Sequence, residues 1–344
     1  MVKIGINGFG RLGRQLLKVV INKYKQKTVA DLPRLVMIND AELPTKCVGY
    51  LIRNDTYYGK FAGDIVEMDD SISVDGLRIE ISREPNPEKI QWSKNGVEYI
   101  IDTTGKNTTC NLASKFLRAG VKRVIVTGCS NVPMFIVGVN HACFTKEMKS
   151  ISAATPSMNC LAVMMKVLHE NFEIEEAMAT AFHPLNSSDK ILDDPGPSNC
   201  RSSRSAIMSF SPTDATTKKE VVDKIMPELE GKTESAAIKI PVACVGGIDL
   251  TVKFKKNAPA EMIRCKLKDA SDGPMKEVLG YSDEELVSSD LIGNSKSCVI
   301  DSKSAVNCSK CTAKIFAWYD AEHAFASRLF DLAKYISSRE DCAK

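Results

Sequence analysis

The first forty residues change their hydrophobic period twice. Residues 2–6 form a short β-branched run, Leu12, Leu16 and Val20 then recur at helical spacing, and residues 34–40 form a second apolar run. The pattern predicts a strand, a helix and a second strand, which together make a βαβ unit.

The same alternation continues to about residue 127. Residues 98–102 and 123–127 are typical of strands, and residues 111–119 between them are typical of a helix. Repeated alternation of strands and helices favours a doubly wound α/β domain with a parallel sheet.

The pattern changes after about residue 155. A long strand-like run covers residues 244–254 and stands among helical segments, which predicts an α+β second domain. Residues 186–205 are rich in Ser, Asp, Pro and Asn and show no period, so we expect an ordered loop that crosses the surface. Residues 322–338 predict an amphipathic C-terminal helix.

Composition agrees with two soluble domains. The chain has 344 residues, 44% of them hydrophobic, and a formal charge of only +3. Its basic and acidic residues are interspersed, so neither nucleic acid nor a membrane surface is an expected partner. The N-terminus enters a strand-like run at once, without the pattern of a signal peptide, and the predicted location is cytoplasmic.

The twelve cysteines are thinly spread, and no metal site is predicted from their spacing. The one close pair, Cys308 and Cys311, lies in a strand-like stretch. We interpret this pair as structural thiols, with a redox or metal pair as the alternative.

Residues 8–13, Gly-Phe-Gly-Arg-Leu-Gly, fit the pattern G-x-G-x-x-G between the first strand and the first helix. In that context Gly8 permits a tight turn, Gly10 lets a pyrophosphate approach the backbone, and Gly13 allows close packing of helix on strand. Asp40, at the end of the second strand, is placed to accept hydrogen bonds from an adenosine ribose and to disfavour a 2′-phosphate. The predicted cofactor is therefore NAD, with a glycine turn that binds no ligand as the alternative.

The segment from Gly5 to Arg14 resembles the opening of the glyceraldehyde-3-phosphate dehydrogenase family, and the likeness continues through most of the chain. Other blocks that carry the resemblance are residues 133–140, 159–162, 166–172, 227–232, 279–281, 287–290 and 318–320. The resemblance implies a Rossmann doubly wound NAD-binding domain over residues 1–155, an α+β substrate domain over 156–319, and a C-terminal helix over 320–344 that returns to the first domain. It also implies a homotetramer. The cofactor residues that it and the glycine motif predict are Asn7, Gly8, Gly10, Arg11, Leu12, Gly13, Asp40 and Thr127.

The family's reaction begins with a cysteine thiolate that attacks an aldehyde. Its motif Ser-Cys-Thr-Thr-Asn-Cys-Leu-Ala-Pro reads Thr-Pro-Ser-Met-Asn-Cys-Leu-Ala-Val at residues 155–163, so Pro156 stands at the nucleophile's position. Proline suits the first position of a helix, and Thr155 can cap that helix. The fold is therefore expected to tolerate a change that removes the nucleophile.

His183 matches the family's general base and confirms this register. Cys160 then corresponds to the family's second cysteine, about 6 Å further along the helix, where we expect a buried thiol with a raised pKa. Without a thiol to deprotonate, we interpret His183 as a polar histidine of the core or cleft rather than a catalytic one.

The residues expected to hold a substrate phosphate are also changed. Asn186 and Lys239 replace a threonine and an arginine, and lysine lacks the bidentate fork of arginine. Ser157, Arg204 and Thr216 complete this weak phosphate site, with Ala215 as the alternative to Thr216. At the nicotinamide end, Ala321 replaces an asparagine and Phe325 a tyrosine.

Two functional hypotheses follow from the sequence. The leading one is a pseudoenzyme: an NAD-binding homologue that is inactive as a phosphorylating dehydrogenase and acts through its surface, as a homo-oligomer or in mixed assemblies with active paralogues. The alternative is an NAD-dependent aldehyde dehydrogenase or a hydrolase that uses a displaced nucleophile, Cys160 or Ser157, with His183.

Overall fold

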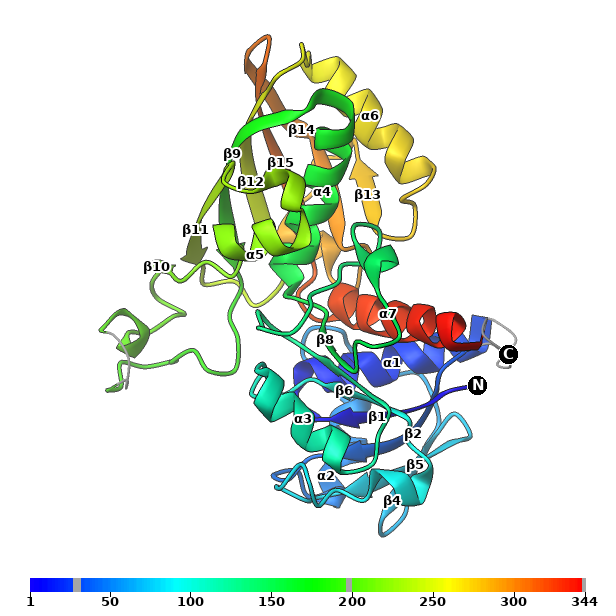
Figure 1. Cartoon of the computed structure of the whole chain (residues 1–344). Helices are drawn as coiled ribbons and strands as arrows, with labels where there is room; N and C mark the ends of the chain where they lie inside the picture. Colours follow the sequence, from blue (N-terminus) through cyan, green and yellow to red (C-terminus); the bar gives the residue numbers. More distant parts are fainter. Residues whose placement is uncertain (27–31, 196–199, 342–344) are drawn as a thin grey trace. The chain divides into compact units, whose positions relative to one another are not determined.

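The computed structural model describes residues 1–26, 32–195 and 200–341. The chain folds into two compact units, the first made of Met1–Ala154 and Phe325–Lys344 and the second of Thr155–Ala324. Each unit has its own sheet (Figure 1). No described helix is both long enough and apolar enough to cross a membrane.

The first unit contains an eight-stranded sheet in the order β3-β4-β5-β2-β1-β6-β7-β8. Strands β5, β2, β1, β6, β7 and β8 run parallel, whereas β3 and β4 form an antiparallel edge. The strands are β1 (Lys3–Asn7), β2 (Arg34–Asn39), β3 (Ile65–Glu67), β4 (Ser71–Val74), β5 (Leu77–Ser82), β6 (Tyr99–Asp102), β7 (Arg123–Val126) and β8 (Ser150–Ser152). Its helices are α1 (Arg11–Gln26), α2 (Thr45–Arg53), α3 (Cys110–Arg118), the short η2 (Trp92–Asn95) and η3 (His141–Cys143), and α7 (His323–Asp341), which begins at the boundary between the units.

The central strands of this sheet are almost continuously apolar because helices cover both faces. Ile4, Ile6, Tyr99, Ile101 and Ile125 are fully buried. The C-terminal helix α7 supplies Leu329, Phe330, Leu332 and Ile336 to the same core. The last helix of the chain is thus an integral layer of the first unit, as Figure 1 shows in red.

The second unit contains a seven-stranded sheet in the order β10-β11-β9-β12-β15-β14-β13. Its strands are β9 (Ile174–His183), β10 (Ser211–Thr213), β11 (Thr233–Lys239), β12 (Gly246–Phe254), β13 (Leu279–Ser282), β14 (Cys298–Ser309) and β15 (Thr312–Tyr319). Its helices are α4 (Pro156–Phe172), α5 (Lys219–Ile225), α6 (Ala260–Asp272) and the short η4 (Arg201–Ser203), η5 (Pro227–Leu229) and η6 (Ser288–Leu291). Mixed parallel and antiparallel pairing makes this unit α+β, so both parts of the predicted fold class are confirmed.

Helix α4 lies between the sheet and α6 and is apolar on almost every side. Twelve of its seventeen residues are buried, among them Met158, Cys160 and Leu161. It contacts strands β9, β12, β14 and β15 as well as helix α6. A helix that is apolar all round belongs in a core, so the start of α4 is held rigidly by the packing of the rest of the helix.

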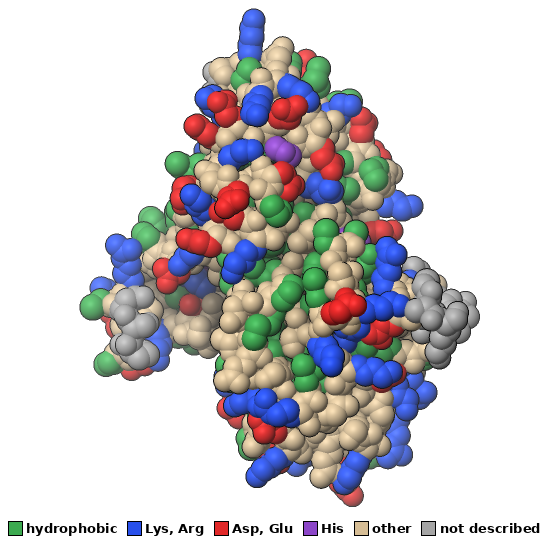
Figure 2. All heavy atoms as spheres, in the orientation of Figure 1, with side chains coloured by type: hydrophobic (Ala, Val, Ile, Leu, Met, Phe, Trp, Pro, Cys, Tyr) green, Lys and Arg blue, Asp and Glu red, His purple; other side chains and the backbone are tan. Residues whose placement is uncertain are grey.

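The predicted loop between residues 186 and 205 is irregular apart from the single turn η4, and residues 196–199 lie outside the described part of the chain. Several large apolar side chains of this stretch and its continuation to residue 213 face solvent. On the face drawn in Figure 2, basic and acidic side chains are interspersed over the surface, as the sequence predicts.

The C-terminal helix is fastened by an ion pair as well as by its apolar face. Glu340 accepts a hydrogen bond from Nε of the buried Arg123 at 2.5 Å and another from the hydroxyl of Tyr99. Arg123 also donates to the carbonyl oxygens of Met148 and Lys146, at 2.8 and 2.9 Å. Removing the carboxylate would leave a buried guanidinium with an unmet charge.

We therefore predict that Glu340→Gln lowers the free energy of unfolding by about 1–3 kcal/mol, the cost of leaving a buried polar group without its partner. Urea unfolding of the two proteins measures the difference. The matched control is Glu80→Gln, which breaks a surface pair with Arg78 and should change stability by less than about 1 kcal/mol. Equal effects of the two substitutions would contradict the prediction.

Candidate functional site

The glycine motif forms the turn between β1 and α1. Gly8 adopts a φ of +91°, which favours glycine. A Cβ at Gly13 would lie 2.2 Å from the carbonyl oxygen of Gly8, so only glycine lets the helix approach the turn this closely. A Cβ at Gly10 would meet nothing within 4 Å, which leaves space beside the N-terminus of α1 for an anionic group.

Asp40 holds this turn from the end of β2. Its Oδ2 accepts a hydrogen bond from the amide of Phe9 at 2.7 Å, and its Oδ1 accepts from the amides of Glu42 and Leu43. The carboxylate is half-buried beside the glycine turn. This is the place at which the sequence predicts the ribose contact.

Asn7 lies beneath the turn in a buried network. Its side-chain amide donates to Asp102 at 2.7 Å, and its side-chain oxygen accepts from Asn39 at 2.9 Å. Burial raises the pKa of Asp102 above its ordinary value, opposed by hydrogen bonds from Asn7 and Thr104. The contribution of the Asn7 side chain is therefore to fix the ends of β1, β2 and β6 under the turn.

The remaining predicted cofactor residues surround the same end of the sheet. The guanidinium of Arg11 stacks 4.7 Å from the ring centre of Tyr57, and Leu12 packs against the core of the unit. Thr127 is buried at the end of β7, where its hydroxyl donates to the carbonyl oxygen of Asp102 at 3.0 Å. All of these positions lie at the carboxyl ends of parallel strands, where open α/β sheets bind their ligands.

In the second unit, helix α4 begins with Thr155 as N-cap and Pro156 as its first residue. The hydroxyl of Thr155 accepts a hydrogen bond from the amide of Met158 at 3.3 Å. Proline costs nothing here because the first amides of a helix have no partner within the helix. Its ring therefore occupies the first position of α4, beside the capping hydroxyl of Thr155.

Three hydroxyls gather next to Pro156. Oγ of Ser157 lies 2.8 Å from Oγ1 of Thr216, and Oγ1 of Thr155 lies 3.4 Å from both. These contacts bring Ser157 and Thr216 together as the sequence predicts. Ala215, the alternative to Thr216, is buried.

His183 ends strand β9, and its Nδ1 lies 3.1 Å from the hydroxyl of Tyr319. That hydroxyl donates to the carbonyl oxygen of Phe182 at 3.2 Å, so Nδ1–H of His183 donates to Tyr319 and Nε2 carries a lone pair. Nε2 is buried and makes no hydrogen bond within the described residues. Burial, with a smaller contribution from the charge of Lys239, lowers the pKa of His183 from its ordinary value to about 4.

Lys239 and Asn186 both meet a residue that the sequence analysis did not single out, Asp189. Nζ of Lys239 lies 2.9 Å from Oδ2 of Asp189, and the same oxygen accepts the amide of Asn186 at 2.7 Å. Lys239 also donates to the carbonyl oxygen of Pro184. Asp189 lies in an aperiodic segment, and no spacing in the sequence indicated this pairing.

These side chains surround one cavity of about 320 Å³. Its described lining includes Pro156, Ser157, His183, Thr216 and Lys239, and none of the described lining residues is a cysteine. Arg204 does not line this cavity: it is exposed, pairs with Asp193 at 2.8 Å, and lines a neighbouring hollow that shares Lys239 with it. The structure thus brings together four of the five predicted phosphate-site residues, namely Ser157, Asn186, Thr216 and Lys239.

Cys160 lies one turn into α4 and is fully buried. Burial, reinforced by a neighbouring thiol at Cys298, raises its pKa well above the ordinary value for cysteine. Its Sγ lies 3.9 Å from the carbonyl oxygen of Trp318. A buried neutral thiol of this kind is a poor nucleophile.

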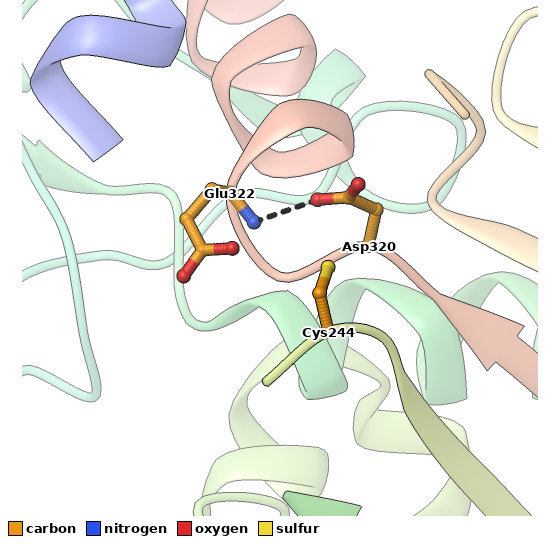
Figure 3. Close-up of side chains that lie close together, drawn as sticks. All are labelled: Cys244, Asp320 and Glu322. Carbon is orange, nitrogen blue, oxygen red and sulfur yellow. Dashed lines mark hydrogen bonds between the residues drawn. The ribbon is translucent and has the colours of Figure 1, made fainter. Parts of the chain in front are cut away.

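Another group of side chains, Cys244, Asp320 and Glu322, has ligand atoms within 4.8 Å of one another (Figure 3). Asp320 already supports the backbone: it accepts hydrogen bonds from the amides of Gly293, Glu322 and His323, at 2.8, 3.0 and 2.7 Å. These bonds account for the buried carboxylate as a structural cap next to α7. Cys311 is a free thiol, and the side chain of Cys308, its predicted neighbour, lies outside the described part of the structure.

Comparison with known proteins explains both units. Residues 2–110 match the NAD-binding domain of glyceraldehyde 3-phosphate dehydrogenase, and residues 156–321 match its C-terminal domain. The chain belongs to the glyceraldehyde-3-phosphate dehydrogenase family. Glyceraldehyde-3-phosphate dehydrogenase 1 of Drosophila melanogaster is 36% identical over 341 residues, which cover 99% of this chain and all of the relative. The enzyme of the yeast Wickerhamomyces ciferrii is 34% identical, with 98% of this chain and 99% of the relative covered.

The match to the NAD-binding domain identifies NAD as the cofactor, and the first unit fits it. The open space at Gly10, the glycine-dependent turn and the carboxylate of Asp40 are the features that a dinucleotide requires.

A chloroplastic member from Arabidopsis thaliana, 34% identical over 97% of this chain and 78% of its own length, is another relative.

The neutral state of His183 gives a prediction about pH. Because the pKa of His183 falls from about 6.5 unfolded to about 4 folded, the unfolded chain takes up a proton that the folded chain refuses. The stability that this group contributes is therefore present above about pH 6.5 and lost as the pH falls towards 4. Between pH 7 and pH 5 the loss should be about 2 kcal/mol.

Urea unfolding of the wild type and of His183→Gln at these two pH values measures the loss, since the variant should lack that part of the pH dependence. Proton NMR should also place the imidazole titration near pH 4. An imidazole that titrates near 6.5 would contradict the neutral buried histidine.

Proposed function

We propose that this chain is an NAD-binding member of its family that does not catalyse the phosphorylating oxidation of glyceraldehyde 3-phosphate. The observation that carries the proposal is Pro156 at the first position of α4, where the family resemblance places the nucleophilic cysteine. Proline has no nucleophilic atom, and no thioester can form on it. The relatives are named as dehydrogenases, and the proposed difference in activity between them and this chain rests on Pro156.

The alternative, a dehydrogenase or hydrolase with a displaced nucleophile, requires a nucleophile that contacts a base. The hydroxyl of Ser157 is hydrogen-bonded to Thr216, and Nε2 of His183, which carries the lone pair, makes no hydrogen bond to any described residue. Cys160 is buried with a raised pKa. These arrangements favour a non-catalytic protein over an enzyme that uses Ser157 or Cys160 as its nucleophile.

The same proposal assigns roles to the residues around each site. Gly8, Gly10, Arg11, Leu12, Gly13, Asp40 and Thr127 surround the NAD site, with Asn7 as support beneath it. His183 keeps the place of the general base but serves as a polar residue of the cavity wall. The location that the sequence predicts for the protein is cytoplasmic.

The test of this function compares cofactor binding with turnover. Calorimetric titration should detect NAD binding, while NADH formation from glyceraldehyde 3-phosphate and phosphate should be about 10⁶-fold below that of active relatives, the scale seen when a catalytic nucleophile is removed. Turnover within tenfold of those relatives would refute the proposal.

The variant Pro156→Cys should gain a reactive thiol at the position of the family's nucleophile. A thiol at the N-terminus of α4 should have a lowered pKa, so mass spectrometry should find rapid iodoacetamide labelling at position 156 in this variant. Pro156→Ser is the matched control without a thiol. Fast labelling of Cys160 in the wild type would instead support the displaced nucleophile.

We also propose that the protein assembles as a homotetramer, or in mixed assemblies with active paralogues, through the segment 186–213. This segment exposes Ile191, Leu192, Ile207, Met208 and Phe210, of which Met208 is 82% and Phe210 72% exposed. Several exposed large apolar side chains in one segment favour burial against another protein surface.

Sedimentation velocity should therefore show an oligomer for the wild type and smaller species for the double variant Met208→Ser, Phe210→Ser. The control is Met178→Ser, since Met178 is 64% exposed but lies on β9, outside this segment. A wild-type monomer, or an oligomer that the double variant leaves intact, would argue against this interface.

A further inference from the structure

The cation of the cavity is already neutralised from within the chain. Nζ of Lys239 lies 2.9 Å from the carboxylate of Asp189, and both side chains are largely buried, 12% and 20% exposed. A partly buried pair is screened less by solvent than a surface pair. A phosphate that enters the cavity must therefore displace Asp189 or approach a lysine whose charge is compensated.

The pair is held in place by the backbone on both sides. Oδ2 of Asp189 accepts the amide of Asn186 at 2.7 Å, and Lys239 donates to the carbonyl oxygen of Pro184 at 3.2 Å. The amide of Asp189 in turn donates to the carbonyl oxygen of Asn186 at 3.2 Å. These contacts make a tight turn that presents the carboxylate to Lys239, so the pairing does not depend on one flexible side chain meeting another.

Two carboxylates, Asp214 and Glu322, also line the described wall, and its remaining polar groups are uncharged donors and acceptors. Ser157 and Thr216 contribute hydroxyls, and Asn186 contributes an amide. His183 contributes a buried Nε2 that makes no hydrogen bond within the described residues and carries no positive charge at neutral pH. Such a wall suits a ligand whose hydroxyl hydrogens can satisfy Nε2, and a volume of about 320 Å³ suits a small molecule.

We propose that Asp189 determines the specificity of this cavity: it disfavours the binding of phosphate esters and favours a small, uncharged, hydroxylated ligand. The inference deepens the proposed function, because both concern the same cavity. It can be tested separately from that function, because it predicts which ligand binds in the cavity and not whether a reaction follows.

The decisive variant is Asp189→Asn, which keeps the side chain's shape and its hydrogen-bond acceptor while releasing the charge of Lys239. Inorganic phosphate, titrated by calorimetry or followed through the NMR signals of His183, should bind this variant about tenfold more tightly than the wild type. The double variant Asp189→Asn, Lys239→Gln should lose the gain, because the released cation is its source.

Glu175→Gln is the matched control, since it breaks an exposed pair with Lys253 away from this cavity and should leave phosphate binding unchanged. In the wild type, glyceraldehyde should perturb the His183 signals at concentrations at which glyceraldehyde 3-phosphate does not.

Three results would overturn the inference: equal phosphate affinity in the wild type and in Asp189→Asn, the same gain in Glu175→Gln, or stronger binding of the phosphorylated aldehyde by the wild type. Each of these is a binding result that stands apart from NADH formation. A failure here therefore differs from a failure of the proposed loss of catalysis.

Discussion

The start of helix α4 is the constraint on which the chemistry of the second unit depends. Most of the helix is buried and packs against the sheet and α6, so its first residue is held in place by the rest of the helix. The hydroxyl of Thr155 caps the helix, and Pro156 occupies a position at which neither its fixed φ nor its missing amide has a cost. Stability therefore does not oppose proline at this place. What the position can do chemically is decided entirely by the side chain that stands there.

Much of the architecture followed from the sequence because it depends on local periodicity. The runs at residues 2–6, 34–40, 98–102 and 123–127 became β1, β2, β6 and β7, and the stretch 111–119 became α3 within one residue at each end. The antiparallel edge formed by β3 and β4 was not predicted. Both strands are short; β3 is mostly exposed and β4 alternates serine with an apolar residue, so they lack the continuous apolar pattern of the central strands.

The candidate site was predictable where a motif carries it and unpredictable where tertiary contacts do. The glycine turn and the cap of α4 depend on residues adjacent in sequence, and the sequence indicated both. The pairing of Asp189 with Lys239 depends on the irregular segment after β9 folding back to the end of β11, which no local pattern encodes. The same holds for the hydrogen bond from His183 to Tyr319, which joins residues far apart along the chain.

The dinucleotide turn and the cavity of the second unit depend on different local contacts, so residues of the cavity can change without affecting the turn. The dinucleotide turn is specified by backbone sterics: a Cβ at Gly13 would collide with the carbonyl oxygen of Gly8, and Asp40 fixes the turn through the amide of Phe9. None of these contacts involves the cavity of the second unit. There, proline at a helix start and a carboxylate beside a lysine alter reactivity and charge without opening a void in the core or breaking a strand pair. Because each feature is accommodated by its own local geometry, a proline at the start of α4 and an ion pair at Lys239 require no change in the cofactor domain.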